Sequence, residues 1–571
     1  MLEDCPDLLD SRGEFDLLGR TFLDFLRYKI GEAFKNVPKL DGLVLTLTEA
    51  DYSVIHNSCP EQYPPDEVVC RIIEVFAEEH RKRGRRFILR SFGSIAQDYR
   101  DILAGAALAA EKHSFEIETK IVPYDFIPFL PPNPFLHALP NTGLNAECDC
   151  LGEYLGAGYL PGCSVPDIYR YVKEGREKGV SRYSIRLDRI GNNIFDSSHE
   201  INLYAYTRFI RDPEATVEQV MKEYAAEHYP RCAREMTELQ TAGLECVKHT
   251  NFIHRNVVFH KFPIQPDFKW IKAGGSFSLY RDGFDLHLQE DCWGIRHREK
   301  TPGRKAILAE KALACEEAEK GLGRLRALKE VLPGAEYEKQ ERAWSHAIKI
   351  SSAIEAYTRA VAAYFDDMEA MEENPRKLLR TVEKSIATIS ALMKDSNAPL
   401  PGLASCCDGA PLPGDNLDTV YFSGLRFLCG ELRKEYAAEY AARREMMERD
   451  EVIDFVIPGG LYDDVRTGRA MHASHSCLRG GHPVRYAGNT VFPNGTIRVE
   501  LHSAPGAILE IMLDGESAET LAVWLNGRKQ VVAAPGHRVT LELGTTEKVC
   551  CSIGKYGRIY PGVRSVAVLK G

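Results

Sequence analysis

The feature that most constrains the fold is the alternation of short strand patterns with helical patterns across the first third of the chain. Five segments rich in strand-forming residues have this strand pattern, at residues 41–48, 85–91, 115–122, 143–150 and 180–187. Between them, helical patterns cover residues 65–81, 98–112 and 165–178. Such alternation is typical of a parallel α/β sheet. We therefore predict an α/β fold, as a barrel or a doubly wound sheet.

The pattern changes twice further along the chain. From residue 216 long amphipathic helical patterns replace the strands, at residues 216–229, 305–331, 337–371, 375–393 and 418–447. After residue 450 short alternating strands broken by Gly, Pro and Asn predict an antiparallel β-sandwich. A chain of 571 residues is long enough for about three or four domains. We predict a barrel-like domain over residues 1–215, a helical domain over 216–450 and a sandwich over 451–571.

Composition and net charge exclude some classes of binding partner. The formal net charge of -10 repels phosphate backbones, so nucleic acid is not expected as a partner. No run reaches 18 consecutive apolar residues and the first thirty residues lack a secretory pattern, so we expect no membrane association and a cytoplasmic location. Cys148 and Cys150 could begin a metal site, or be two small core residues; without a CxxC or His partner set, we expect no metal and no cofactor.

Charged residues follow the predicted strands at the end where a parallel barrel carries its active site. Three carboxylates and two cations follow four different strands: Glu49, Arg90, Lys120, Asp125 and Glu153. Glycoside hydrolysis uses two carboxyl groups, one as acid and one as base. Two cations in such a pocket fit an anionic sugar, held by charge-assisted hydrogen bonds. Each charge taken alone could instead be solvated or part of a structural ion pair.

The run from residue 115 to residue 156 resembles the catalytic stretch of the α-glucuronidases of glycoside hydrolase family 67. The matching motifs are Lys120, the Pro-Tyr-Asp-Phe turn at 123–126, Ala-Leu-Pro-Asn-Thr at 138–142 and Glu-Tyr-Leu-Gly at 153–156. Weaker similarity continues upstream around Glu49 and Arg90 and downstream over residues 202–213. The likeness covers residues 10–230, and it implies a (β/α)8 TIM barrel.

This resemblance also implies roles for individual residues. Glu49 would be the general acid, and Asp125 with Glu153 would activate water in an inverting reaction. Arg90 and Lys120 would bind a uronate carboxylate, and Tyr154 would contact the substrate or pack behind Glu153. The expected function is that of an exo-acting glycoside hydrolase that releases a terminal α-linked uronic acid from an oligosaccharide. Where the family has a further Lys this chain has Leu45, so a related sugar stays open as the substrate.

The resemblance also implies which barrel strands the five predicted strands correspond to. If Glu49 follows the fourth barrel strand, the five predicted strands are the fourth to the eighth. Either the chain is a fragment of a longer protein, or another chain completes the barrel, or the sheet is a smaller α/β fold. The alternative function is that of a non-catalytic carbohydrate-binding protein, or an inactive barrel fragment, in which the sandwich binds the sugar. An oligosaccharide is the expected partner, and a homodimer is left open.

Overall fold

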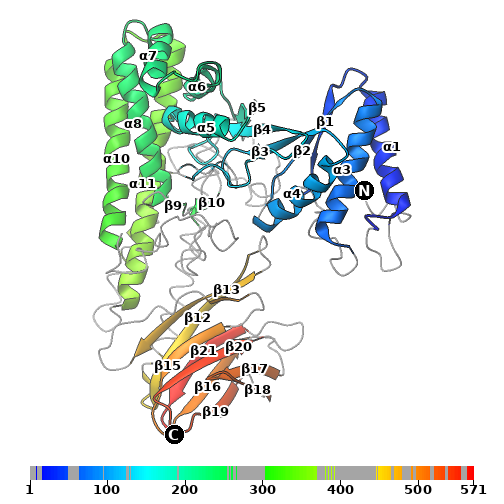
Figure 1. Cartoon of the computed structure of the whole chain (residues 1–571). Helices are drawn as coiled ribbons and strands as arrows, with labels where there is room; N and C mark the ends of the chain where they lie inside the picture. The colour runs from blue at the N-terminus through cyan, green and yellow to red at the C-terminus, as the bar shows by residue number, and fades with distance from the viewer. Residues whose placement is uncertain are drawn as a thin grey trace. The chain divides into compact units, whose positions relative to one another are not determined.

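A computed structural model describes residues 16–48, 63–93, 96–123, 130–189, 192–253, 303–369 and most of 449–571, with isolated residues and short strands elsewhere. The chain divides into two compact units. Figure 1 colours the chain by residue number. One unit contains Met1–Val247, Ser278–Leu288 and Lys320–Ser345, and the other contains the remaining residues. The predicted three-domain division stays a prediction. Within the described ranges, no helix is both long and apolar enough to cross a membrane.

The first unit contains a five-stranded parallel sheet. Its strands are β1 (Gly42–Thr46), β2 (Arg86–Arg90), β3 (Phe115–Lys120), β4 (Thr142–Asp149) and β5 (Arg182–Arg186). They lie side by side in chain order, β1-β2-β3-β4-β5, and every pairing is parallel (Figure 1). The α/β class and the five predicted strands are confirmed. A strand order that follows the chain fits an arc of a barrel, but the described residues add no further strand to this sheet, and a complete barrel stays a prediction.

One face of this sheet is apolar and covered by helices. The helices of this region are α1 (Arg20–Asn36), α3 (Pro65–Lys82), α4 (Ala96–Ala110), α5 (Val165–Glu177) and α6 (Glu200–Arg211). Side chains from α3 and α4 form one buried cluster with Phe87 and Leu89 of β2 and with Phe115 and Ile117 of β3. The sequence of α3 favours a helix at both ends, since Pro65 begins it, acidic residues occupy its first turn and basic residues its last.

The opposite face of the sheet is polar. Successive side chains of a strand point to opposite faces, so Glu116, Glu118 and Lys120 of β3 share a face that excludes Phe115 and Ile117. Contacts across the strands confirm this arrangement. Glu116 binds Arg86 and Arg182 from two other strands, and the Ser184 hydroxyl donates to Glu118 over 2.8 Å. A row of charged and polar groups therefore runs along the face that carries the candidate site.

Helices dominate the middle of the chain. They are α7 (Val217–His228), α8 (Ala233–Asn251), α10 (Arg304–Ala327) and α11 (Gly334–Glu369). A capping box between Thr216 and Gln219 begins α7. The carbonyls at the end of α8 accept hydrogen bonds from the buried Lys311 ammonium. The helical prediction is confirmed for α7, α10 and α11, whereas most of the helical patterns at 375–393 and 418–447 lie outside the described residues.

Two antiparallel sheets form the C-terminal part. The first has the order β14-β13-β12-β21-β16-β19, and the second the order β15-β20-β17-β18. The strands are β12 (Val452–Asp464), β13 (Arg469–Leu478), β14 (Thr490–Phe492), β15 (Ile497–His502), β16 (Ile508–Asp514), β17 (Thr520–Leu525), β18 (Arg528–Ala533), β19 (Arg538–Glu542), β20 (Lys548–Gly554) and β21 (Gly562–Leu569). One buried cluster takes side chains from both sheets, among them Leu509 and Val568 of the first and Val523 and Cys551 of the second. The antiparallel sheets predicted after residue 450 are confirmed.

The remaining strands of the described residues form short antiparallel pairs. They join β6 (Asp188–Arg189) to β7 (Asn192–Asn193), β8 (Phe252–Ile253) to β9 (Asn256–Val257), and β10 (Phe259–His260) to β11 (Gln265–Pro266). Only the first pair lies close to the parallel sheet in sequence, directly after β5.

Candidate active site

The candidate site lies at the carboxyl edge of the parallel sheet. The strand register sets Thr46 beside Arg90, Lys120 beside Glu147 and Asp149 beside Arg186. Polar residues from all five strands therefore end at the same edge. This edge is where a parallel α/β sheet holds its ligands.

Arg90 is held by Glu147 at this edge. Its Nε donates to Glu147 Oε2 over 2.6 Å and its Nη2 donates to Glu147 Oε1 over 3.1 Å. Both side chains are 12% exposed. The guanidinium carbon also lies 4.8 Å from the centre of the Phe92 ring. A two-point bond of this kind fixes the plane of the guanidinium as well as its position.

Arg186 links two carboxylates that come from different places in the chain. Its Nη1 donates to Glu153 Oε2 over 2.9 Å, and its Nη2 lies 3.7 Å from Glu147 Oε1. The Glu153 side chain is 1% exposed, whereas that of Arg186 is 24% exposed. A line of alternating charge therefore runs from Arg90 through Glu147 and Arg186 to Glu153.

Lys120 adds a third cation. It is 1% exposed, although lysine is one of the residues most rarely buried. Its ammonium lies 3.9 Å from the centre of the Phe92 ring and 4.8 Å from the centre of the Phe126 ring. Arg186 lies 5.2 Å from the same Phe126 ring. Each of the three cations thus lies near at least one aromatic ring, whose face attracts it.

The loop after β4 places Glu153. Both oxygens of Asp149 accept backbone hydrogen bonds from this loop, from Leu151 over 3.0 Å and from Glu153 over 2.7 Å. Gly152 has a φ of 73° and Gly156 a φ of 94°, which a side chain would strain. Asp149 therefore fixes the backbone of Glu153 at the sheet edge.

Tyr154 follows Glu153 in this loop, and its side chain is fully buried. Both predicted roles of Tyr154, packing behind Glu153 and contact with the substrate, stay predictions. Glu49 and Asp125, the other two predicted catalytic residues, lie outside the described residues. Their described neighbours flank the edge: the Thr48 hydroxyl donates to the Phe92 carbonyl over 2.7 Å, and Phe126 has a φ of 60°, unusual for a residue with a side chain. Three of the six predicted site residues, Arg90, Lys120 and Glu153, thus gather at one edge.

Two residues of the site, Glu147 and Arg186, were not among the predicted site residues. A signal for both was present in the sequence, since every second residue of β4 and of β5 is polar on the same face: Asn145, Glu147 and Asp149, and Arg182, Ser184 and Arg186. A strand buried on both faces would be apolar at these positions. The alternation identifies the polar face of the sheet, but it does not predict which side chains on that face form ion pairs.

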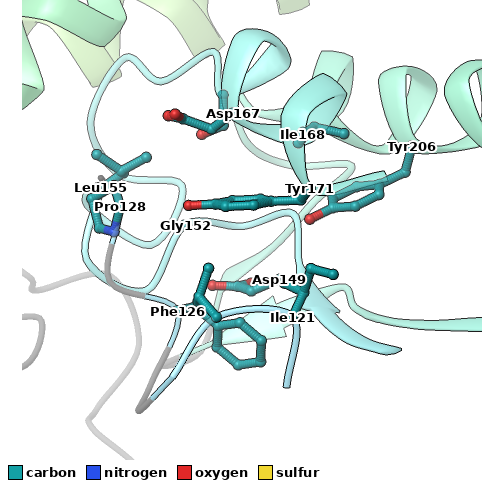
Figure 2. A pocket seen from close by; sticks show the side chains of 12 residues that line it. Ile121, Phe126, Pro128, Asp149, Gly152, Leu155, Asp167, Ile168, Tyr171 and Tyr206 are labelled. Atoms are coloured by element: carbon teal, nitrogen blue, oxygen red, sulfur yellow. The ribbon is translucent and has the colours of Figure 1, made fainter. Parts of the chain in front are cut away.

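Asp149 also lines a small cavity on the α5 side of the strand ends. Figure 2 shows Tyr171 in this cavity, between Asp149 and Asp167 in this view. Burial is the main cause that raises the pKa of the Tyr171 hydroxyl, with Asp167 adding to it. The cavity volume is about 30 Å³, room for about one water molecule and too little for a sugar ring.

The two cysteines of β4 and the turn after it are core residues here. Cys148 and Cys150 are both buried, and burial raises the pKa of each thiol. The Cys150 thiol donates to the Arg186 carbonyl over 3.0 Å. Among the residues described, no group of three or more His, Cys, Asp and Glu side chains could hold a metal ion.

No protein family matches the sequence, and no curated protein matches it. Among solved structures, this chain is similar to a GH138 enzyme targeting pectin rhamnogalacturonan II. The two share 13% sequence identity, the match covers 97% of this chain and 70% of that one, and the TM-score is 0.48. A likeness this weak carries no argument about the fold or the activity of this chain.

Proposed function

We propose that this protein is a glycoside hydrolase that acts on an anionic sugar, a terminal α-linked uronic acid or a related residue, at the carboxyl edge of the parallel sheet. One observation carries the proposal. The buried carboxylate of Glu153 lies within one network of hydrogen bonds and ring contacts that also contains the cations Arg90, Lys120 and Arg186. A carboxylate near several fixed cations suits a substrate that itself has a negative charge.

The roles follow from the chemistry of inversion. Glu153, together with Asp125, would accept a proton from the attacking water, and Glu49 on the other side of the sugar would protonate the leaving oxygen. Arg90 and Lys120 would bind the uronate carboxylate. The proposal includes a (β/α)8 barrel, of which the five described strands would be the fourth to the eighth. In this proposal the C-terminal sandwich has no catalytic role.

The first test is hydrolysis of a panel of 4-nitrophenyl α- and β-uronosides, with the matching neutral hexosides as controls. We expect release from at least one uronoside and little from its hexoside. Proton NMR of the product in the first minutes of turnover gives its anomer, and the anomer opposite to that of the substrate is expected for inversion. Hydrolysis of hexosides in preference to uronosides would contradict the anionic substrate.

Variants then test the roles. Asp125→Asn should lower kcat by a factor of about 10² to 10⁴, the usual contribution of a positioned acid or base. Glu49→Gln needs an oligosaccharide substrate as well, because 4-nitrophenol leaves readily without protonation. We expect its loss to be larger on the oligosaccharide than on the aryl glycoside. Glu111→Gln, at an exposed position after α4, is the control.

Substantial activity in Asp125→Asn would remove the assignment of that residue. Sugar binding without turnover of any substrate in the panel would instead favour the carbohydrate-binding alternative. Thermal unfolding with and without millimolar glucuronate measures such binding, because a ligand of the folded state raises the midpoint.

A further inference from the structure

Arg186 contacts two carboxylates and an aromatic ring at the site edge. Glu153 lies 2.9 Å from one of its terminal nitrogens and Glu147 lies 3.7 Å from the other. The Phe126 ring lies 5.2 Å from its guanidinium carbon. Each terminal nitrogen is thus directed at a different carboxylate, and an aromatic ring lies close to the guanidinium. These three contacts fix the guanidinium in position and in plane.

The surroundings of Glu153 contain other negative charge. Asp149 contacts the backbone of Glu153, and Glu147 shares Arg186 with it. Neighbouring carboxylates disfavour ionisation of one another, and burial disfavours it further. Glu153 is almost fully buried, so both effects act on it. An opposite charge in direct contact is the effect that favours the carboxylate form.

The remaining charged groups at this edge come from other elements. Lys120 extends from β3 and Arg90 from β2, and Arg90 makes its two-point bond with Glu147 rather than with Glu153. His199, the N-cap residue of α6, is buried against the same loop, and burial lowers its pKa to about 4, so it is neutral near pH 7. Arg186 contacts Glu153 directly, with its Nη1 2.9 Å from Glu153 Oε2.

We propose that Arg186 is a positioning residue for hydrolysis, which keeps Glu153 ionised and fixes the direction of its carboxylate. This inference rests on the proposed function, because it gives Glu153 the role of a base. Arg186 would act through Glu153 and would not contact the sugar. A carboxylate base has to be ionised to accept a proton from water. The loss of Arg186 should therefore shift the pH range over which the enzyme is active, and not only lower its maximal activity.

The test is the pH dependence of kcat/KM on the best uronoside, for wild type, Arg186→Met and Arg186→Lys. Without the guanidinium, Glu153 should bind a proton at higher pH. The acid limb of the Arg186→Met profile should therefore move up by about one pH unit or more. Arg186→Lys keeps the charge and should move the limb less. Activity of the Met variant should recover toward wild type at the alkaline end.

A matched control lies on the same strand face. Arg182 is four residues before Arg186 and forms an ion pair with Glu116 over 2.6 Å, away from the carboxyl edge. Arg182→Met should keep the wild-type profile. An acid limb that is unchanged in Arg186→Met, or a uniform loss of activity at all pH values, would overturn the inference.

A second measurement separates this inference from the proposed function. Urea unfolding of wild type, Arg186→Met, Glu153→Gln and the double variant forms a double-mutant cycle that needs no substrate. We expect non-additive effects at pH 7 that fade as the pH is lowered enough to protonate Glu153. Additive effects at pH 7 would show that Arg186 does not stabilise the carboxylate. An inactive wild type with non-additive effects would instead reject the hydrolase and retain the ion pair.

Discussion

Glu116 and Glu118 lie two residues apart on β3, yet their pKa values move in opposite directions. Burial on its own would raise both. Bonds from Arg86, Arg182 and Asn145 more than compensate at Glu116 and lower its pKa to about 2. At Glu118 burial remains the largest effect, opposed by the hydrogen bond from Ser184, and the pKa is raised. The number of cationic donors that reach each carboxylate decides the direction.

Glu116 should therefore stabilise the fold at neutral pH and not in acid. Its pKa is lowered in the folded state, so its contribution is complete above the unfolded value of about 4.3 and is lost as the pH falls toward 2. Because Arg86 and Arg182 are more than half exposed, we expect only about 1–2 kcal/mol. Urea unfolding of Glu116→Gln should show this loss at pH 7 and a smaller one at pH 3. An equal loss at both pH values would show that charge is not the cause.

At the scale of elements, two helical glycines differ in what surrounds them. Gly105 is buried on α4, and a Cβ there would lie 2.6 Å from the Asp66 carbonyl oxygen and from Val69 of α3. Gly323 is exposed on α10, with nothing within 4 Å of the same position. Gly105 thus permits the close approach of α3 and α4, whereas Gly323 has no such role.

Alanine at these two positions should change stability in opposite directions. Gly105→Ala forces α3 and α4 apart, and we expect a loss of about 1–3 kcal/mol. Gly323→Ala removes the conformational cost of glycine in a helix and should add up to about 1 kcal/mol. Urea unfolding of the two variants checks both values. A neutral Gly105→Ala would mean that the helices can separate at little cost.

Some elements were predictable from the sequence and others were not. The parallel strands are short segments of strand-forming residues with helical patterns between them, so their positions were predicted to within a few residues. The helices α1 and α8 were not predicted. Gly19 precedes α1 and makes no side-chain cap, so α1 lacks the polar start signal that a capping residue gives. Its helical pattern is amphipathic but has no marked beginning.

For the whole molecule, strand register limits what the sequence can say about the site. Arg90 and Glu147 are 57 residues apart in the chain and on strands that are not neighbours, with β3 between them. Spacing predicts that Arg90, Lys120 and Glu153 come to one edge, because the edge is common to all parallel strands. It cannot predict that Glu147 binds Arg90 and lies beside Arg186, because the register across three strands sets those distances.

In the C-terminal part of the chain, the first strand, β12, pairs with the last strand, β21. β21 lies in the sheet between β12 and β16, and the Lys570 backbone N–H donates to the Glu451 carbonyl over 2.7 Å. The buried cluster between the sheets takes its buried residues from Leu501 to Val568. Residues 445–571 thus contain both the strands and the core that they need.

We therefore expect residues 445–571 to fold when expressed alone, close to the predicted domain of 451–571. Circular dichroism with urea should show one cooperative transition. A shorter piece, residues 445–561, is the control. It lacks β21 and leaves β12 and β16 without their shared neighbour, so it should not unfold cooperatively. Absence of a transition in the longer piece would mean that these sheets depend on residues before 445, and cooperative unfolding of the shorter one would mean that β21 is not needed for the core.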